Sequence, residues 1–374
     1  MKKSKKFTIK KQNPRVLVAP LDWGLGHSTR CIPIIKELIL LGCDVYIVAD
    51  KKTFSLLKKE FPGTVFLRYK GYEIEYSRQK SFFSLKLILQ APKIILRIIQ
   101  EKRWLKKVIK RYSIDAVISD NRFGMYHKNF PSIYITHQLF IKTGNKFSEG
   151  IAQKIHYHFI KKYSCCWVPD EGKDGLAGEL SHPKKMPGNV IYIGPVSRFD
   201  KIPDMEKVYD LLIIISGPEP QRTIFENNIL EQLKTVDGNI YLIRGLPEES
   251  EPPENFKNIT IKNHLPANEL NEVFAMSKVV ICRSGYTSVM DLTALQKKAI
   301  LIPTPGQTEQ EYLAKYLMEK GFFFSEKQNN FSIKQSLKKA ATFHFKKLDF
   351  PKGEYKKTVA EFVNSLKFKN DPTH

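Results

Sequence analysis

The stretch RVLVAPLDWGLGHSTRCIPIIKELILLGCDVYIVA, residues 15–49, decides the fold of this chain. It begins with the apolar run 15–20, passes through a glycine loop into an amphipathic segment that opens near Ser28, and ends with a second apolar run at 44–49. The apolar residues of the middle segment recur at helical spacing: Ile32, Ile35, Leu38 and Ile39. Strand, helix and strand in this order predict a βαβ unit with parallel strands.

The alternation of strand and helix continues through the rest of the chain. In the first half, four further apolar runs are predicted strands: 64–69, 115–120, 132–137 and 190–195. After the charged, proline-containing stretch 194–207 the alternation starts again, with strands predicted at 210–217, 239–245, 259–265, 278–285 and 298–306. The helices of this second series are expected near 220–235, 267–277, 286–296 and 308–320.

The length of the chain also indicates two domains. A single core seldom grows past roughly 200 to 250 residues, and this chain has 374. We therefore expect an α/β fold of two Rossmann-like domains facing each other across a cleft, with ligands outside the carboxyl ends of the strands. The expected divisions are 1–198, 199–350 and a C-terminal helix and tail at 351–374.

The composition bounds the class of protein. Hydrophobic residues make up 42% and aromatic residues 11% of the chain, which is enough to bury a core. The net charge of +23 would attract nucleic acid, anionic lipid or an anionic substrate, but no zinc finger, RNP-like signature or helix-turn-helix supports a nucleic-acid partner. The N-terminal MKKSKKFTIKKQ lacks an apolar h-region, and no apolar run approaches about 20 residues, so we expect a cytoplasmic protein. Its five scattered cysteines are expected to be reduced thiols.

The loop after the first strand carries the first candidate chemistry. In Asp22-Trp23-Gly24-Leu25-Gly26-His27-Ser28, Gly24 and Gly26 allow the backbone to approach a ligand, and the helix start offers free N–H groups. The spacing departs from the dinucleotide fingerprint G-x-G-x-x-G, which argues against an NAD-type dehydrogenase. His27 at the helix start is either a general base or a polar cap.

An acid that orients the imidazole of His27 is expected nearby. Asp120, at the end of the strand 115–120, and Asp22, in the same loop, are the two candidates. We favour Asp120, although it can equally act as a helix cap. His137 ends the neighbouring strand and is a further candidate.

The second half repeats the strand-loop-helix pattern with polar loops. Arg283-Ser284-Gly285 follows an apolar strand and opens a helix, an arrangement that suits a phosphate group. Asp291 stands on that helix, where a carboxylate can accept hydrogen bonds from a ribose diol. The loop Pro305–Glu311 adds amide and carboxylate groups suited to sugar hydroxyls.

The motifs GLGH, CRSGYTSVMD and PTPGQTEQEYLAKYL together resemble the glycosyltransferases of the GT-B fold. The nearest type is family 28, which includes the N-acetylglucosaminyltransferase that completes the lipid-linked peptidoglycan precursor. The resemblance covers most of the chain in order and is most specific between Asn263 and Leu317. It implies an acceptor-binding first domain and a nucleotide-sugar-binding second domain.

The resemblance also implies roles for individual residues. Its donor-binding residues would be Ser284 and Gly285 at the phosphates, Asp291 at the ribose, Gln310 and Glu311 at the sugar, Arg198 at the diphosphate, and Ser216, Gly217 and Arg283 beside them. Three features depart from the family pattern: Asp291 replaces the usual Glu, Glu311 replaces a common second Gln, and the loop 216–222 is not glycine-rich. These departures leave the sugar unassigned.

The implied activity is transfer of a sugar, such as an N-acetylhexosamine, from a UDP-sugar to a hydroxyl of a glycan or lipid-linked acceptor. The resemblance implies inversion at the anomeric carbon, and the lack of a D-x-D element or metal-ligand cluster predicts a reaction without metal or cofactor. Two alternatives remain open. One is a UDP-sugar 2-epimerase, and the other is a noncatalytic protein that binds membranes or anionic polymers.

The segment 81–111 suggests contact with a membrane. It interleaves Phe, Leu, Ile and Trp with Lys and Arg, and Pro92 is expected to divide it into two helices. A basic amphipathic helix can lie among lipid headgroups, attracted by anionic lipids. The alternative is an apolar stripe that belongs to the core, with a solvated basic side. We expect a peripheral protein on the inner face of the cell membrane.

Overall fold

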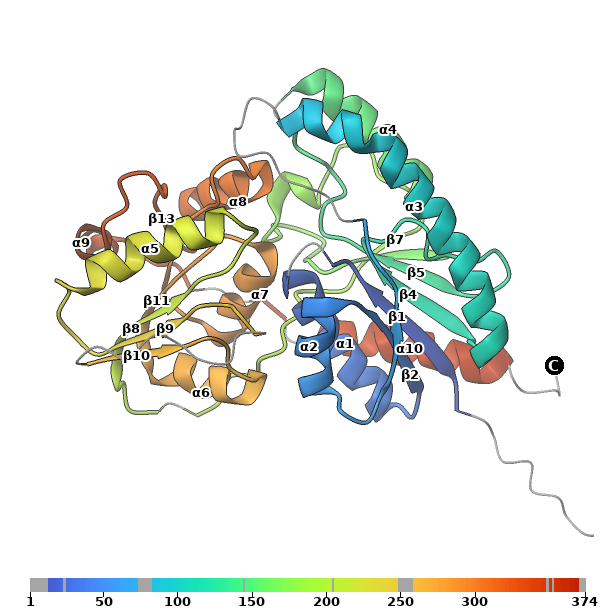
Figure 1. The fold of residues 1–374 in the computed structure, drawn as a ribbon, viewed down its shortest axis with the longest axis horizontal. Helices are drawn as coiled ribbons and strands as arrows, with labels where there is room; N and C mark the ends of the chain where they lie inside the picture. Colours follow the sequence, from blue (N-terminus) through green and yellow to red (C-terminus); the bar gives the residue numbers. More distant parts are fainter. Residues whose placement is uncertain are drawn as a thin grey trace, which may run out of the picture.

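Two α/β lobes lie side by side in the computed structural model, each built on one parallel sheet (Figure 1). The structure describes residues 13–22, 25–72, 83–143, 145–203, 205–247, 258–347, 350–351 and 353–369. The predicted fold class, α/β with two Rossmann-like domains, is confirmed.

The first sheet has the strand order β3-β2-β1-β4-β5-β6-β7. Its strands are β1 (Arg15–Pro20), β2 (Asp44–Ala49), β3 (Val65–Arg68), β4 (Ala116–Asp120), β5 (Ser132–Ile135), β6 (Cys165–Val168) and β7 (Val190–Tyr192). The helices between them are α1 (Leu25–Leu40), α2 (Lys51–Glu60), α3 (Phe83–Tyr112) and α4 (Lys146–Ile160). The strand order reverses between β1 and β4, so the crevice of this sheet opens between their carboxyl ends.

The second sheet repeats this topology with the order β10-β9-β8-β11-β12-β13. Its strands are β8 (Tyr209–Ile214), β9 (Ile240–Ile243), β10 (Ile259–Lys262), β11 (Ser277–Cys282), β12 (Ala299–Leu301) and β13 (Phe324–Ser325). Its helices are α5 (Gln221–Leu233), α6 (Ala267–Met276), α7 (Tyr286–Leu295), α8 (Thr308–Glu319) and α9 (Ile333–Thr342). The order reverses between β8 and β11, which sets the second crevice.

The last helix, α10 (Glu354–Lys369), returns to the first lobe and lies along α1 (Figure 1). The ring of Phe362 packs edge-on against Trp167 of β6, and Lys367 Nζ donates to the carbonyl of Leu41. These contacts bury the apolar face of α10 in the core of the first lobe. The domain boundaries at 198 and 350 stay predictions.

Several local expectations differ from the structure. The strands β6 and β13 and the helix α9 were not predicted. The first helix begins at Leu25, ahead of the expected Ser28, so His27 lies in its first turn. The expected division at Pro92 is wrong, because α3 runs unbroken from Phe83 to Tyr112. A proline removes only one backbone hydrogen bond, and buried side chains such as Leu105 hold the rest of this long helix on the core.

Candidate active site

The crevices of the two sheets open on the same cleft, and residues from both lobes meet there. In the first lobe, Asp120 ends β4, and His27 stands in the first turn of α1, which follows β1. The helix α7, which follows β11, starts directly opposite, and Thr287 Oγ1 donates a 3.0 Å hydrogen bond to the carbonyl of Gly26. Two helix N-termini therefore face each other across the cleft. Of the predicted site residues, only Gly24 lies outside the part of the chain that the structure describes.

The structure places His27 beside Asp120. His27 Nδ1 lies 3.0 Å from Asp120 Oδ2, and the side chain of His27 is 23% exposed while that of Asp120 is 0% exposed. Asp22, the other candidate, lies against Gly71 instead: a Cβ added to Gly71 would stand 1.9 Å from the Oδ1 of Asp22. The imidazole of His27 is thus partly exposed, while its Nδ1 contacts a buried carboxylate.

Arg30 contacts both residues of this pair and was not among the predicted site residues. Its guanidinium is buried and forms a close ion pair with Asp120, and its Nη2 also lies 3.0 Å from His27 Nδ1. Burial alone raises the pKa of Asp120, but the charges and hydrogen bonds of Arg30 and His27 outweigh it and hold that pKa below its ordinary value. Asp120 is therefore a carboxylate. Arg30 stands three residues after His27, on the same face of α1, and this helical spacing was the available signal.

His137 connects Arg30 with the second lobe. Arg30 Nη1 lies 2.9 Å from His137 Nδ1, and His137 Nε2 lies 2.7 Å from an oxygen of Glu309 at the start of α8. A guanidinium only donates hydrogen bonds, so Nδ1 of His137 accepts, and Nε2 carries the proton that is donated to Glu309. Burial lowers the pKa of His137, which favours this neutral form. Its ring also stacks on Tyr286 of α7, with 4.2 Å between centroids.

Three of the predicted donor-binding residues form hydrogen bonds that stabilise the loops of the second lobe. Ser284 Oγ donates to the carbonyl of Gln310 at 2.9 Å, and the amide oxygen of Gln310 accepts from the backbone N–H of Thr304 at 2.9 Å. The carboxylate of Glu311 accepts from the N–H of Gly306 at 3.1 Å, within its own loop. On this helix Glu309, which the sequence did not single out, is the carboxylate that faces the first lobe.

Arg283 brings a buried positive charge to the carboxyl end of β11. It is 1% exposed, and its guanidinium donates to carbonyl oxygens, including those of Gln221 at 3.1 Å and Ser216 at 3.4 Å. Burial lowers its pKa to about 10. Within the described ranges its guanidinium forms no ion pair with a carboxylate. An uncompensated buried charge is costly, so this position favours an anionic ligand.

Asp291 and Arg198 meet at the hinge between the lobes. Asp291 Oδ1 accepts a 2.7 Å hydrogen bond from Ser197, and Arg198 Nε lies 3.6 Å from Asp291 Oδ2. The Nε and Nη1 atoms of Arg198 are buried and make no hydrogen bond to any residue that the structure describes. Burial, only partly offset by Arg198, raises the pKa of Asp291 to about 6. Arg198 thus keeps donor capacity that an anion in the cleft can use.

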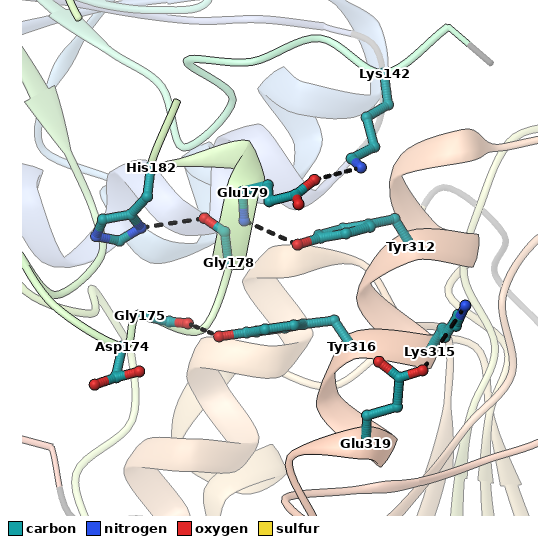
Figure 2. A pocket seen from close by; sticks show the side chains of 10 residues that line it. All are labelled: Lys142, Asp174, Gly175, Gly178, Glu179, His182, Tyr312, Lys315, Tyr316 and Glu319. Carbon is teal, nitrogen blue, oxygen red and sulfur yellow. Dashed lines mark hydrogen bonds and ion pairs between the residues drawn. The ribbon is translucent and has the colours of Figure 1, made fainter. Parts of the chain in front are cut away.

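Two aromatic residues further along α8 contact a loop of the first lobe (Figure 2). The parallel rings of Tyr312 and Tyr316 face the loop that follows β6: Tyr312 accepts from the N–H of Glu179 at 2.8 Å, and Tyr316 donates to the carbonyl of Gly175 at 3.0 Å. Lys142 lies 4.3 Å from the ring centre of Tyr312 and bonds to Glu179. These residues line a pocket of about 580 Å³ at the junction of the lobes. We refer to Tyr312, Tyr316 and the 175–179 loop as the latch.

Along the described ranges, no group of three or more His, Cys, Asp or Glu side chains is arranged to hold a metal ion. No helix among the same residues is long and apolar enough to cross a membrane.

Comparison with known proteins finds a matching domain in the second half of the chain. Residues 223–367 match the glycosyltransferase family 28 C-terminal domain. The UDP-N-acetylglucosamine--N-acetylmuramyl-(pentapeptide) pyrophosphoryl-undecaprenol N-acetylglucosamine transferase of Clostridium tetani (strain Massachusetts / E88) is 24% identical over 298 residues, which cover 74% of this chain and 75% of that protein.

Solved structures of glycosyltransferases share the fold. The glycotransferase of kitacinnamycin has a TM-score of 0.61 and 14% identity, covering 96% of this chain and 95% of that one. The spinosyn rhamnosyltransferase SpnG complexed with thymidine diphosphate has a TM-score of 0.60 and 13% identity, covering 95% and 96%. The chain is therefore a glycosyltransferase of the GT-B fold that carries a glycosyltransferase family 28 C-terminal domain.

Proposed function

We propose that this glycosyltransferase moves a sugar from a UDP-sugar to a hydroxyl of a glycan or lipid-linked acceptor, with inversion and without a metal ion. One observation carries the proposal: the His27–Asp120 pair lies beside the start of α7, and the turn that precedes this helix carries the buried cation Arg283. The reaction needs a base at the acceptor hydroxyl and positive charge at the leaving diphosphate, and this cleft offers both.

The proposed chemistry is a single displacement. The N–H of His27 Nδ1 forms a hydrogen bond to Asp120. The lone pair on Nε2 of the same ring then takes the proton of the acceptor hydroxyl. The hydroxyl oxygen forms a bond to the anomeric carbon while the bond from that carbon to the phosphate oxygen breaks. The electron pair leaves with the diphosphate. Attack from the face opposite the leaving group inverts the anomeric carbon.

The leaving diphosphate is proposed to lie between the lobes at the start of α7. Gly285 is the N-cap of this helix and has no side chain that could cap it, so we propose that the first N–H groups and the helix dipole stabilise an anion. Arg283 and the unpartnered N–H groups of Arg198 add positive charge. The remaining donor contacts are also proposals. Ser284 and Gly285 would bind the phosphates with Ser216 and Gly217 beside them, Asp291 would bind the ribose, and Gln310 with Glu311 would bind the sugar.

The nucleotide is proposed to be UDP because the Clostridium tetani relative is named for UDP-N-acetylglucosamine. A thermal-shift comparison of UDP-, dTDP- and GDP-sugars tests this, since a ligand that binds only the folded state raises the melting temperature. A UDP-sugar should give the largest shift. A larger shift with a dTDP-sugar would overturn the choice of nucleotide, and conversion of UDP-N-acetylglucosamine without any acceptor would indicate an epimerase.

We also propose that the first lobe docks on an anionic membrane surface. In α4, the apolar side chains of Phe147, Ile151 and Ile155 recur every fourth residue and are exposed, Phe147 by 79%. In α3, which lies beside α4 in Figure 1, Ile95, Leu96 and Ile99 are exposed as well. We call these six residues the apolar face.

Its surroundings favour lipid as the partner. Lys93 of α3 and Lys146 and Lys154 of α4 are exposed on the same two helices and would attract anionic headgroups. The C-terminal half of the predicted segment 81–111 belongs to the core instead, since Leu105 and Ile109 are buried. Residues 73–82 and the side chains of 83–91 lie outside the described residues.

A further inference from the structure

A chain of hydrogen bonds, buried in its middle at His137 and Arg30, runs from the second lobe to the proposed base in the first. Glu309 accepts from His137, His137 accepts from Arg30, and Arg30 in turn contacts both Asp120 and His27. Glu309 is 172 residues from His137 along the chain and stands on the opposite side of the cleft. The chain therefore exists only while the two lobes are docked.

The proton positions in this chain matter at its far end. His27 Nδ1 lies 3.0 Å from both Asp120 Oδ2 and Arg30 Nη2. When the proton is on Nδ1, it forms a hydrogen bond to Asp120, and Nε2 is free to act as a base. If Nδ1 instead accepts from Arg30, the proton sits on Nε2 and the base is blocked. Where Arg30 directs its N–H groups thus decides which tautomer of His27 is favoured.

Two acceptors compete with His27 for the N–H groups of Arg30. Asp120 occupies its Nη2, and His137 Nδ1 occupies its Nη1. Nδ1 of His137 remains an acceptor only while the ring proton is on Nε2. Glu309 keeps the proton on Nε2 by accepting a hydrogen bond from it. The groups that face His137 are Glu309 from α8, Tyr286 from α7, and Arg30 and His27 from α1. Glu309 is the only carboxylate among them.

We propose that Glu309 is a positioning residue that acts across the cleft: through His137 and Arg30 it keeps His27 in the tautomer with a free Nε2 while the lobes are docked. This inference rests on the proposed function, in which His27 takes the acceptor proton. It couples docking of the donor-binding lobe to competence of the base.

The direct test is the tautomeric state of the histidines. Two-bond ¹H–¹⁵N spectra of the full-length protein labelled with ¹⁵N-histidine distinguish Nδ1–H from Nε2–H, and single histidine variants assign the signals. We expect Nε2–H for His137 and Nδ1–H for His27 in the parent protein. Glu309→Ala should turn both signals into mixtures, while Glu309→Gln, whose amide oxygen still accepts from His137, should keep most of the parent pattern. An unchanged His27 signal in Glu309→Ala overturns the inference.

A matched control separates this effect from a general effect of helix α8. Glu319 stands on the same helix, is 63% exposed and pairs with Lys315. Glu319→Gln should leave the signals of His27 and His137 unchanged. Loss of the parent tautomers in this variant as well would assign the effect to α8 as a whole and not to Glu309.

Kinetics supply the second readout, with release of UDP from UDP-N-acetylglucosamine as the assay and a prenyl pyrophosphoryl sugar as acceptor. Glu309→Ala should lower kcat by about 10- to 100-fold while changing KM for the donor less than about threefold. His137→Leu should have a similar effect, and Glu309→Ala added to His137→Leu should lower kcat by no more than about twofold further. His137→Gln can accept from Arg30 and donate to Glu309, so it should recover most of the lost kcat.

The outcomes distinguish this inference from the proposed function. Multiplicative effects of the two substitutions, or a large rise in KM for the donor, would mean that Glu309 contacts the donor directly and would overturn the coupling. A parent protein with the expected tautomers but without UDP release would remove the proposed function and leave the coupling in place.

Discussion

Ser197 Oγ donates a 2.7 Å hydrogen bond to Asp291, which ties the hinge between the lobes to the helix expected to hold the donor ribose. Arg198, the next residue, lies beside the same carboxylate. A ribose diol at Asp291 would have to take over hydrogen bonds that the hinge now makes. Donor binding and hinge position are therefore expected to depend on each other at this carboxylate.

The first prediction concerns affinity. Asp291→Ala should weaken binding of a UDP-sugar by about 5- to 100-fold, because a hydrogen bond to a charged group contributes roughly 1 to 3 kcal/mol. Asp291→Asn keeps one acceptor oxygen and should lie between the parent and the alanine variant. Calorimetric titration measures both. Equal affinities in all three proteins would remove Asp291 from the donor site.

The second prediction concerns stability against pH. Burial raises the pKa of Asp291 to about 6, above its value of about 3.9 in an unfolded chain. Between these pH values the folded state binds more protons, so this group favours folding at low pH and opposes it increasingly as the pH rises to about 6. Asp291→Asn removes the effect. Its free energy of unfolding relative to the parent should be higher at pH 7.5 than at pH 4, by up to about 3 kcal/mol.

Urea unfolding at the two pH values measures this difference. Ser197→Ala leaves the carboxylate buried and removes a hydrogen bond that lowers the pKa of Asp291, so as the matched control it should show a pH dependence at least as steep as that of the parent. A stability difference between Asp291→Asn and the parent that is the same at both pH values would show that the carboxylate is not held at a raised pKa.

The third prediction concerns the base. His27→Ala should lower turnover by about two to four orders of magnitude, because a positioned general base contributes that much, while the thermal shift caused by a UDP-sugar persists. His344→Ala removes an exposed histidine of the second lobe and serves as control. Turnover within threefold of the parent would leave His27 only the role of a helix cap.

The strands and their parallel order could be predicted because each strand is a short apolar run between turn residues. The runs at 15–20 and 278–285 became β1 (Arg15–Pro20) and β11 (Ser277–Cys282) with small changes at the ends. The strand β13 (Phe324–Ser325) is too short to show a period of its own. Its position depends on pairing with β12, which local sequence does not encode.

The candidate site was predictable only where a residue stands at a strand end. His27 and Asp120 meet because the carboxyl ends of β1 and β4 are neighbours in the sheet, and that order follows from the fold. The choice of Glu311 over Glu309 illustrates the limit. Successive residues on a helix point about 100° apart, so which carboxylate faces the cleft depends on the orientation of α8. That orientation is set by packing between the lobes.

The fourth prediction concerns the latch. Gly178 has a φ of +52°, and a Cβ there would lie 2.5 Å from the hydroxyl of Tyr312 and 2.9 Å from Tyr316. Gly178→Ala should therefore strain the loop and push the tyrosines away, at a cost of about 1 to 3 kcal/mol in unfolding free energy. Gly188→Ala is the control, because nothing lies within 4 Å of a Cβ at that position. Equal melting temperatures for both variants would contradict the packing described for the latch.

The last prediction concerns the membrane. The full-length protein should sediment with liposomes that contain anionic lipid at low salt, and less so at high salt, since screening weakens the attraction of Lys93, Lys146 and Lys154 to headgroups. Replacing Phe147, Ile151 and Ile155 by Gln should lower the bound fraction at any salt concentration, by at least about tenfold in partition coefficient, because each side chain contributes roughly 1 kcal/mol or more when buried in lipid.

The control uses an apolar side chain of similar exposure on the other lobe. Ile224, on α5, is 49% exposed, and Ile224→Gln should sediment like the parent protein. The two contributions are separable, because the glutamine variant of α4 keeps its lysines and should retain the salt dependence of the weak binding that remains. If the parent protein stays in solution at low salt, or if the α4 variant binds as well as Ile224→Gln, the apolar face does not contact lipid. A soluble acceptor would then fit the active site better than a lipid-linked one.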